Sequence, residues 1–283
     1  MSIRPPARGP ILRPVTRFLQ TPKGLLLIVL GLLLGLAIPQ EGASLVAPGL
    51  ALITGTAVAL DLVLFRWLRR KWIFPSGAIL TGIIIAVVLS DHEPAYVEVA
   101  TAAIAIGSKH LLRTRWSNVF NPAALALVAS ALLFDSAQSW WGALPDLGLP
   151  GIIALLAVGA FIADRINKLP LLLAFLGAYF ALFSGASFLL EPGRVAEIFR
   201  APDIQAVLFF AFIMVDDPPT CPVRYGDQVM FGILVAVTSY ALFVVNGAVY
   251  YLPAGLLVGN SWETCRRWVT RPNRRPARAA SAG

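Results

Sequence analysis

Charged side chains are scarce in this chain. Aspartate, glutamate, lysine and arginine together make up 13% of its 283 residues, whereas a soluble domain carries about 25%. Mean hydropathy is +0.75 and 58% of the residues are hydrophobic. The apolar runs are too many and too long for one soluble core, so the composition excludes a soluble domain and predicts an all-α polytopic membrane protein.

Cysteine and histidine are also rare. Cys221 and Cys265 both fall on the side that we expect to be cytoplasmic, so no disulfide is expected, and without nearby histidines they predict no metal site. Transmembrane b-haem needs facing pairs of histidines, but the two histidines present, His92 and His110, are expected on opposite sides. The chain also lacks a glycine-rich phosphate loop, a Rossmann fingerprint and a nucleophile triad. We therefore assign no catalytic residue.

Apolar segments fill the sequence between the two polar ends. Several are too short to cross about 30 Å upright as helices, and the third, fifth, eighth and tenth are candidates for half-helices or broken helices. We expect about ten segments, at 22–40, 43–65, 73–90, 94–112, 119–135, 149–164, 169–190, 204–216, 228–246 and 248–262.

Positive charge gathers in the links between these segments. With both termini in the cytoplasm, the inner links and tails contain 21 of the 23 lysine and arginine residues, and only Arg194 and Arg200 lie outside. This distribution follows the positive-inside rule. It predicts a multi-pass protein of the inner (cytoplasmic) membrane with both ends inside. It also indicates that the basic residues behind the net charge of +8 interact with a lipid bilayer and not with nucleic acid.

Two stretches 131 residues apart resemble each other. Residues 120–127 read Phe-Asn-Pro-Ala-Ala-Leu-Ala-Leu, and 251–258 read Tyr-Leu-Pro-Ala-Gly-Leu-Leu-Val. Five segments per half is an odd number, so we expect two inverted repeats, with chance similarity as the alternative. The expected parts are a basic cytoplasmic tail (1–21), a first repeat (22–135), a second repeat (149–262) and a basic, disordered cytoplasmic tail (263–283).

Small and polar residues interrupt the apolar pattern in three places. Residues 74–82 contain Ser-Gly in a short segment, 107–123 contain Gly-Ser-Lys-His and then Asn-Val-Phe-Asn-Pro-Ala, and 215–222 read Val-Asp-Asp-Pro-Pro-Thr-Cys-Pro. In this order and spacing, they resemble the NqrB/RnfD family over about residues 70–260. Members are membrane subunits of the sodium-pumping NADH:quinone oxidoreductase and of the Rnf ferredoxin:NAD oxidoreductase.

The resemblance implies a ten-helix, two-repeat flavoprotein subunit. Such a subunit relays electrons from a soluble flavin or iron–sulfur reductase, or from other Rnf-like subunits, with quinone or ion translocation in the larger complexes. Helix N-termini at prolines can point positive dipole ends at an FMN phosphate. Plain helix packing of small residues, and anchoring by single basic residues, are the alternatives. The flavin-binding candidates are Ser76, Gly77, Lys109, Asn121, Pro122 and Thr220.

Covalent flavin attachment is where the chain departs from the family pattern. Members commonly carry FMN through a phosphoester on the last threonine of Asp-x-x-Ser/Thr-Gly-Ala-Thr. The similar stretch here, 184–187, ends at Ser187, has Ala181 in place of the aspartate and lies in an apolar run. A small-residue helix patch is the preferred interpretation, and Ser187 is the candidate if attachment occurs. We expect FMN or another flavin to bind non-covalently.

Acidic residues inside or beside the apolar segments are candidates for function because they are costly in lipid. Asp61 precedes Arg66 by about one turn, and we expect the two to pair. Asp217 precedes a proline, and we expect it to shape the loop. Asp216 is the candidate for a cation or proton site. Inverted repeats with broken helices also suit a transporter or channel for a small solute, and a plain membrane anchor for an oxidoreductase is a third possibility.

Overall fold

The described part of the chain is helical. The computed structural model describes residues 21–270 apart from 71, 73, 115–116 and 190–198. Within these ranges there is no β-strand, only two isolated bridges. In chain order the helices are α2 (Pro22–Glu41), α3 (Ala43–Arg69), α4 (Ser76–Val88), α5 (Ala95–Leu111), α6 (Pro122–Phe134), η1 (Trp141–Ala143), η2 (Pro145–Leu147), α7 (Gly148–Arg165), α8 (Leu169–Leu189), α10 (Ala201–Phe209), the π-helix η4 (Phe210–Val215), α11 (Tyr225–Asn246) and α12 (Tyr251–Thr270).

In the described part of the chain, five helical stretches are long and apolar enough to cross a membrane. They are Pro22–Glu41, Ala43–Leu68, Trp141–Arg165, Leu169–Ala186 and Tyr225–Asn246. Large apolar side chains point outward from several helices: Leu32, Val63 and Leu132 are each more than 60% exposed. A surface of this kind is stable against lipid tails and unstable against water.

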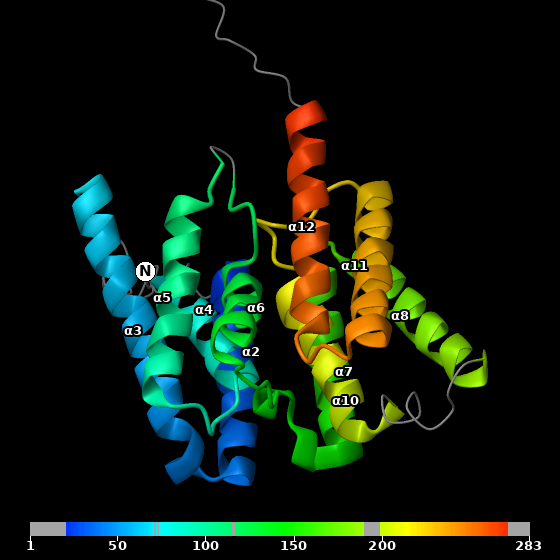
Figure 1. The fold of residues 1–283 in the computed structure, drawn as a ribbon, viewed down its shortest axis with the longest axis horizontal. Helices are drawn as coiled ribbons and strands as arrows, with labels where there is room; N and C mark the ends of the chain where they lie inside the picture. The colour runs from blue at the N-terminus through cyan, green and yellow to red at the C-terminus, as the bar shows by residue number, and fades with distance from the viewer. Residues whose placement is uncertain (1–20, 71, 73, 115–116, 190–198, 271–283) are drawn as a thin grey trace, which may run out of the picture.

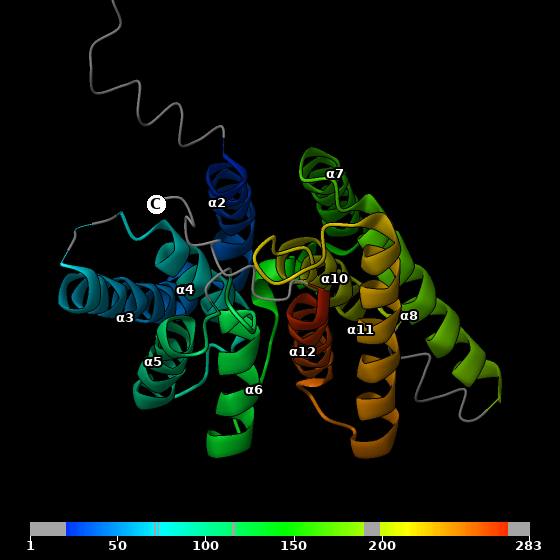
Figure 2. The same cartoon turned by 90° about the horizontal axis from the view of Figure 1, so that it is seen from above.

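The helices form two groups that meet at α6 and α12 (Figure 1). In the first group α3 packs against α4 and α5, and α5 packs against α6. In the second, α8 packs against α11, α11 against α12, and α7 against α10. Seen from above, α3 and α5 lie toward one end of the molecule and α8 and α11 toward the other (Figure 2). Each group therefore has its own helix-to-helix packing.

The short helix α4 ends inside the protein, and the link between the two groups covers its end. Its 13 residues span about 20 Å, so its last carbonyls need partners other than water. The backbone N–H groups of Ser139 and Trp140 donate to the carbonyl of Val88, and Trp141 Nε1 donates to the carbonyl of Ala86 at 2.7 Å. The link thereby provides hydrogen-bond donors for carbonyl groups in the last turn of a helix that is too short to reach a surface.

The start of α6 is fixed by its own sequence. Asn121 caps the helix, and its Oδ1 accepts hydrogen bonds from the backbone N–H groups of Ala123 and Ala124 at 3.0 and 3.2 Å. Pro122 occupies the first helical position, where its missing N–H costs nothing. The prediction that a short helix starts beside this proline is confirmed.

Helix α12 is longer than the sequence predicted. It continues to Thr270, so residues 263–270 are helical and the expectation of a disordered tail from 263 is wrong for them. Glu263 contributes to this extension, because it is 1% exposed and binds Arg266 and Arg267 one turn later. These pairs stabilise another two turns of helix. Residues 1–20 and 271–283 of the two expected tails lie outside the described residues.

Candidate functional site

A cavity of about 680 Å³ lies between the two groups of helices. Its walls come from α2, α4, α5 and α6 on one side, and from α7, η4 and the turn at residues 216–219 on the other. Ligand sites commonly measure about 300–1,000 Å³ and are mostly apolar with a few polar groups. The size and position of this cavity therefore suit one organic ligand.

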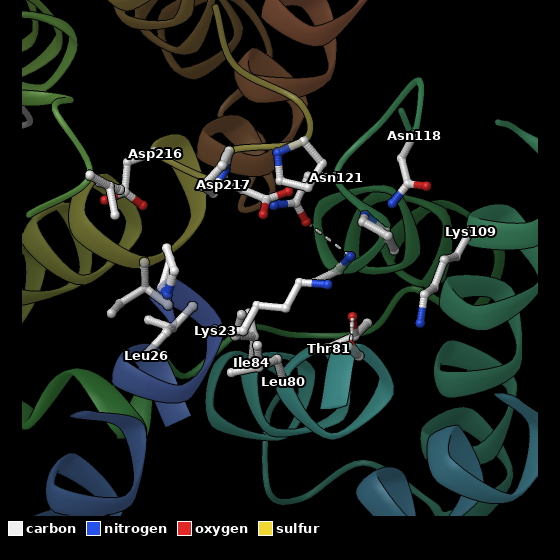
Figure 3. Close-up of a pocket in the computed structure, with 18 of the residues that line it drawn as sticks. Lys23, Leu26, Leu80, Thr81, Ile84, Lys109, Asn118, Asn121, Asp216 and Asp217 are labelled. Carbon is white, nitrogen blue, oxygen red and sulfur yellow. Dashed lines mark hydrogen bonds between the residues drawn. The ribbon is translucent and has the colours of Figure 1, made fainter. Parts of the chain in front are cut away.

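Apolar side chains form one part of the cavity wall, and charged side chains lie at its two ends and between them. Leu26, Leu80 and Ile84 face the space together (Figure 3). Lys109 and Asp216 lie at opposite ends, with Lys23 and Thr81 between them (Figure 3). Such a wall can hold a flat apolar group while its ends meet charged or polar atoms of the same ligand.

The structure brings most of the predicted site residues to this cavity. Of the eight predicted site residues, five line the cavity: Gly77, Lys109, Asn121, Pro122 and Asp216. Three others lie elsewhere. Ser76 begins α4 next to the wall. Thr220 lies behind the turn that forms the wall, buried at 2% exposed. Ser187 belongs to α8, which contributes no described lining residue, and its side chain lies outside what the structure describes.

Asn121 joins the two groups of helices at the cavity wall. Besides capping α6, its Nδ2 donates to the carbonyl of Met214 in η4 at 3.3 Å. Its backbone N–H donates to Oδ1 of Asn260 in α12 at 2.8 Å. Asn260 in turn donates from Nδ2 to the carbonyl of Thr220 at 3.3 Å. These bonds tie the motifs at 118–123 and 215–222 to each other through one side chain of α12.

Sequence reasoning missed the residues of α12 that hold the two motifs together. Arg267 donates from Nη1 to Ser117 Oγ at 2.6 Å and to the carbonyl of Pro219 at 2.9 Å, and from Nη2 to the carbonyl of Cys221 at 2.8 Å. The buried carboxylate of Glu263 binds its Nε at 2.6 Å. The sequence predicts both residues in a cytoplasmic tail, because arginines there resemble ordinary inside charges. An acidic residue three and four positions before two arginines was the available signal.

The turn after η4 carries two carboxylates with different surroundings. Asp217 accepts a hydrogen bond from the hydroxyl of Thr220 at 3.1 Å, and its carbonyl accepts from the backbone N–H groups of Thr220 and Cys221, so it shapes the turn as expected. Burial raises the pKa of Asp217 to about 6, although Thr220 and the positive charges of Lys23 and Lys168 oppose the rise. Asp216 is 3% exposed, and its Oδ2 has no hydrogen-bond partner in the described structure.

Asp61 has partners different from the one expected. It is 1% exposed, and its Oδ1 accepts from Lys109 Nζ at 3.1 Å and from His110 Nε2 at 2.9 Å. The expected pairing with Arg66 one turn away is therefore corrected: Asp61 points across to α5. The sequence favours the nearby opposite charge on the same helix, but α3 packs against α5, and Asp61 bonds to two residues of α5.

The chemistry of the cavity can be limited further. No group of three or more histidine, cysteine, aspartate or glutamate side chains that could hold a metal ion occurs among the residues described. Lysine ammonium groups suit an anionic group of a ligand, and the leucine and isoleucine side chains suit a flat ring system. The residues present therefore suit a ligand that combines a flat apolar part with an anionic group.

Comparison of the chain with models of protein families and with curated proteins gives no match. Fold and site together define a helical protein with membrane-length apolar helices and an amphipathic cavity between two groups of helices.

Proposed function

We propose that this chain is a multi-pass membrane subunit of an electron-transfer complex, of the NqrB/RnfD kind, and that its cavity binds FMN non-covalently. One observation carries the proposal. Three stretches that resemble the family motifs, at 74–82, 107–123 and 215–222, are far apart in the sequence and all contribute to the wall of one cavity. Electrons would come from a soluble flavin or iron–sulfur reductase or from Rnf-like subunits, and quinone is a candidate acceptor.

Different residues of the cavity would contact different parts of such a ligand. Leu80, Ile84 and Ile213 would pack on the ring and exclude water, and Gly77 would leave a surface without a side chain for it to approach. Lys23 and Lys109 would compensate the negative charge of the phosphate. A bound flavin supplies one- and two-electron chemistry, and the protein contributes its position and its electrostatic surroundings.

The proposed topology has ten membrane segments in two inverted repeats, with α2–α6 in the first and α7–α12 in the second. Two features support it. Equivalent pairs of helices pack in both groups: α3 with α5 and α8 with α11, then α5 with α6 and α11 with α12. The ends of α3, α5 and α12 and the start of α11, all next to basic links, lie at the same end of the bundle (Figure 1). We assign this end to the cytoplasm of a cell with an inner membrane.

Asp216 is the proposed cation or proton site of this subunit. It lines the cavity, it is buried, and one of its oxygen atoms lacks a hydrogen-bond partner in the described structure. A buried carboxylate oxygen without a partner is costly unless it binds a proton or a cation. Coupling of electron transfer to ion movement would use this group.

Titration of the purified protein with FMN, followed by quenching of flavin fluorescence, tests the proposal. Ala123 lines the cavity and is 2% exposed, so Ala123→Phe fills the space and should weaken binding by at least about tenfold. Gly35→Leu is the matched control, because nothing lies within 4 Å of the position of its Cβ. Failure of the wild-type protein to quench FMN, or equal affinity in the two variants, would contradict the proposal.

A transporter or channel for a small solute is the second candidate, favoured by the same cavity between helix groups and by the partnerless oxygen of Asp216. Flux of a solute into liposomes that contain only this protein, without any redox partner, would support it. Flavin binding without flux supports the electron-transfer subunit.

A further inference from the structure

Three ionisable side chains meet between α3 and α5, next to the cavity. Asp61 of α3 accepts hydrogen bonds from Lys109 and His110 of α5 through the same oxygen, Oδ1. Lys109 Nζ and His110 Nε2 therefore lie within about 6 Å of each other, close enough for one charge to change the protonation of another. All three side chains are at most 18% exposed. We call this cluster the Asp61 trio.

The Asp61 trio can exist in two protonation states. In the first, the negative charge of ionised Asp61 and the positive charge of protonated Lys109 cancel, and His110 is neutral, so the net charge of the trio is zero. An ionised carboxylate oxygen only accepts hydrogen bonds, so Nε2 of His110 carries a hydrogen atom. A further proton would bind at Nδ1. The second oxygen of Asp61, Oδ2, is buried and has no hydrogen-bond partner in the described structure, so this carboxylate has not used up its capacity to stabilise positive charge.

Lys109 connects the trio to the cavity. It lines the cavity, and its Nζ would lie 3.1 Å from a Cβ added at Gly77. The absence of a side chain at Gly77 thus leaves room for the ammonium group between Asp61 and the cavity. A negative group in the cavity would attract this ammonium group, since a buried pair of opposite charges interacts strongly.

We propose that the Asp61 trio is a proton-uptake site that responds to negative charge in the cavity. When an anion arrives, Lys109 shifts its interaction from Asp61 to the anion. His110 then takes one proton at Nδ1 from a hydronium ion of the solvent and, as an imidazolium ion, compensates Asp61. One N–H bond forms, and one O–H bond of the hydronium ion breaks to leave water. The inference rests on the proposed function only in taking that anion to be the phosphate or the reduced ring of a flavin.

The other charged groups that act on Lys109 are positive and repel its ammonium group. Positive charges on Lys23 of α2 and on Arg113 after α5 act on Lys109. The ring of Phe65 of α3 packs edge-on against His110, with 5.1 Å between centroids. Helices α4 and α6 carry no charged residue. Asp61 is thus the single carboxylate bonded to Lys109 and His110 within the described structure.

Nuclear magnetic resonance of the two histidines tests the coupling without any ligand. His92 has a side chain that is 79% exposed, and it serves as the internal reference for His110. In Lys109→Gln, His110 should become half-protonated at least about one pH unit higher than in the wild type, because a repelling charge is gone. In Asp61→Asn it should move lower, and His92 should not move in either. Lys109→Met repeats the test if Lys109→Gln does not fold. An unchanged His110 midpoint in the variants overturns the inference.

Addition of FMN and of riboflavin to the wild-type protein separates the inference from the proposed function. If FMN binds, as shown by fluorescence quenching, His110 should become protonated at a higher pH than before, and riboflavin, which lacks the phosphate, should have a smaller effect. Binding of FMN with no response at His110 overturns the inference and leaves the proposed function standing. No binding of FMN, together with a shift in Lys109→Gln, refutes the proposed function and supports the trio.

Discussion

The backbone N–H of Asn121 donates a 2.8 Å hydrogen bond to Oδ1 of Asn260, which lies 139 residues further along the chain. Through this bond α12 is attached to the start of α6, and through its Nδ2 the same Asn260 is attached to the turn at Thr220. A single amide side chain thereby fixes two of the three motif segments that form the cavity wall.

Replacement of that side chain should destabilise the whole site. Asn260→Ala leaves the N–H of Asn121 and the carbonyl of Thr220 buried without partners, at a cost of about 1–3 kcal/mol for each group. Thermal unfolding in detergent measures the effect. Ser261→Ala, in the same helix but exposed, is the control and should change stability by less than about 0.5 kcal/mol. Equal melting temperatures for the two variants would contradict the assigned role.

Close packing of α11 against α8 depends on Gly232. A Cβ at this position would stand 2.5 Å from the carbonyl oxygen of Leu171 and 2.9 Å from the backbone nitrogen of Phe175, and backbone atoms cannot move aside without shifting a helix. Gly232→Ala should therefore destabilise the protein by about 1–3 kcal/mol. Gly226→Ala, in the first turn of the same helix with nothing within 4 Å of its added Cβ, should be neutral or slightly stabilising. The reverse order of stability would contradict this helix packing.

The raised pKa of Asp217 predicts how the stability of the folded protein depends on pH. Its ordinary value of 3.8 applies to the unfolded chain and a value of about 6 to the folded one, so unfolding releases a proton between these values. Stability contributed by this group should fall as pH rises from about 4 to about 6 and stay level above that. Asp217→Asn keeps an acceptor for Thr220 but cannot ionise. Its melting temperature relative to the wild type should rise over the same interval, and a constant difference would refute the prediction.

The two cysteines report on both burial and orientation. Cys265 is exposed, whereas Cys221 is buried, and burial raises the pKa of the Cys221 thiol to about 12. A membrane-impermeant maleimide should modify Cys265 in inside-out vesicles and not in right-side-out ones, and should reach Cys221 only after unfolding. Cys265→Ser is the control for the assignment. Modification of Cys265 from the outside would contradict the proposed cytoplasmic position of the C-terminal end.

Much of the helical pattern could be predicted from one sequence because it depends on local chemistry. Runs of apolar residues set the long helices, and an asparagine followed by a proline fixed the start of α6 at Pro122. Gly77 and Lys109, candidates from the resemblance, and Asp216, a candidate from its charge, all line one cavity in the structure.

The partners of the buried charges could not be predicted in this way. Asp61 and Lys109 are 48 residues apart, and which faces of α3 and α5 meet is decided by packing over the whole length of the two helices. A local pattern therefore favours the nearby Arg66 as the partner. Likewise, Arg267 looked like an ordinary cytoplasmic anchor, although it holds Pro219 and Cys221. Long-range contacts of this kind leave little signal in a local pattern.

The most direct measurement of the central claim is the visible spectrum of the protein after gentle isolation from its native membrane with its partners present. Acid precipitation then separates released flavin from flavin attached to the chain. We predict flavin absorption bands in the isolated protein and FMN in the supernatant after precipitation, with none attached at Ser187. A protein that shows no flavin in either fraction, and whose complex shows none, would contradict the claim that this cavity is a flavin site.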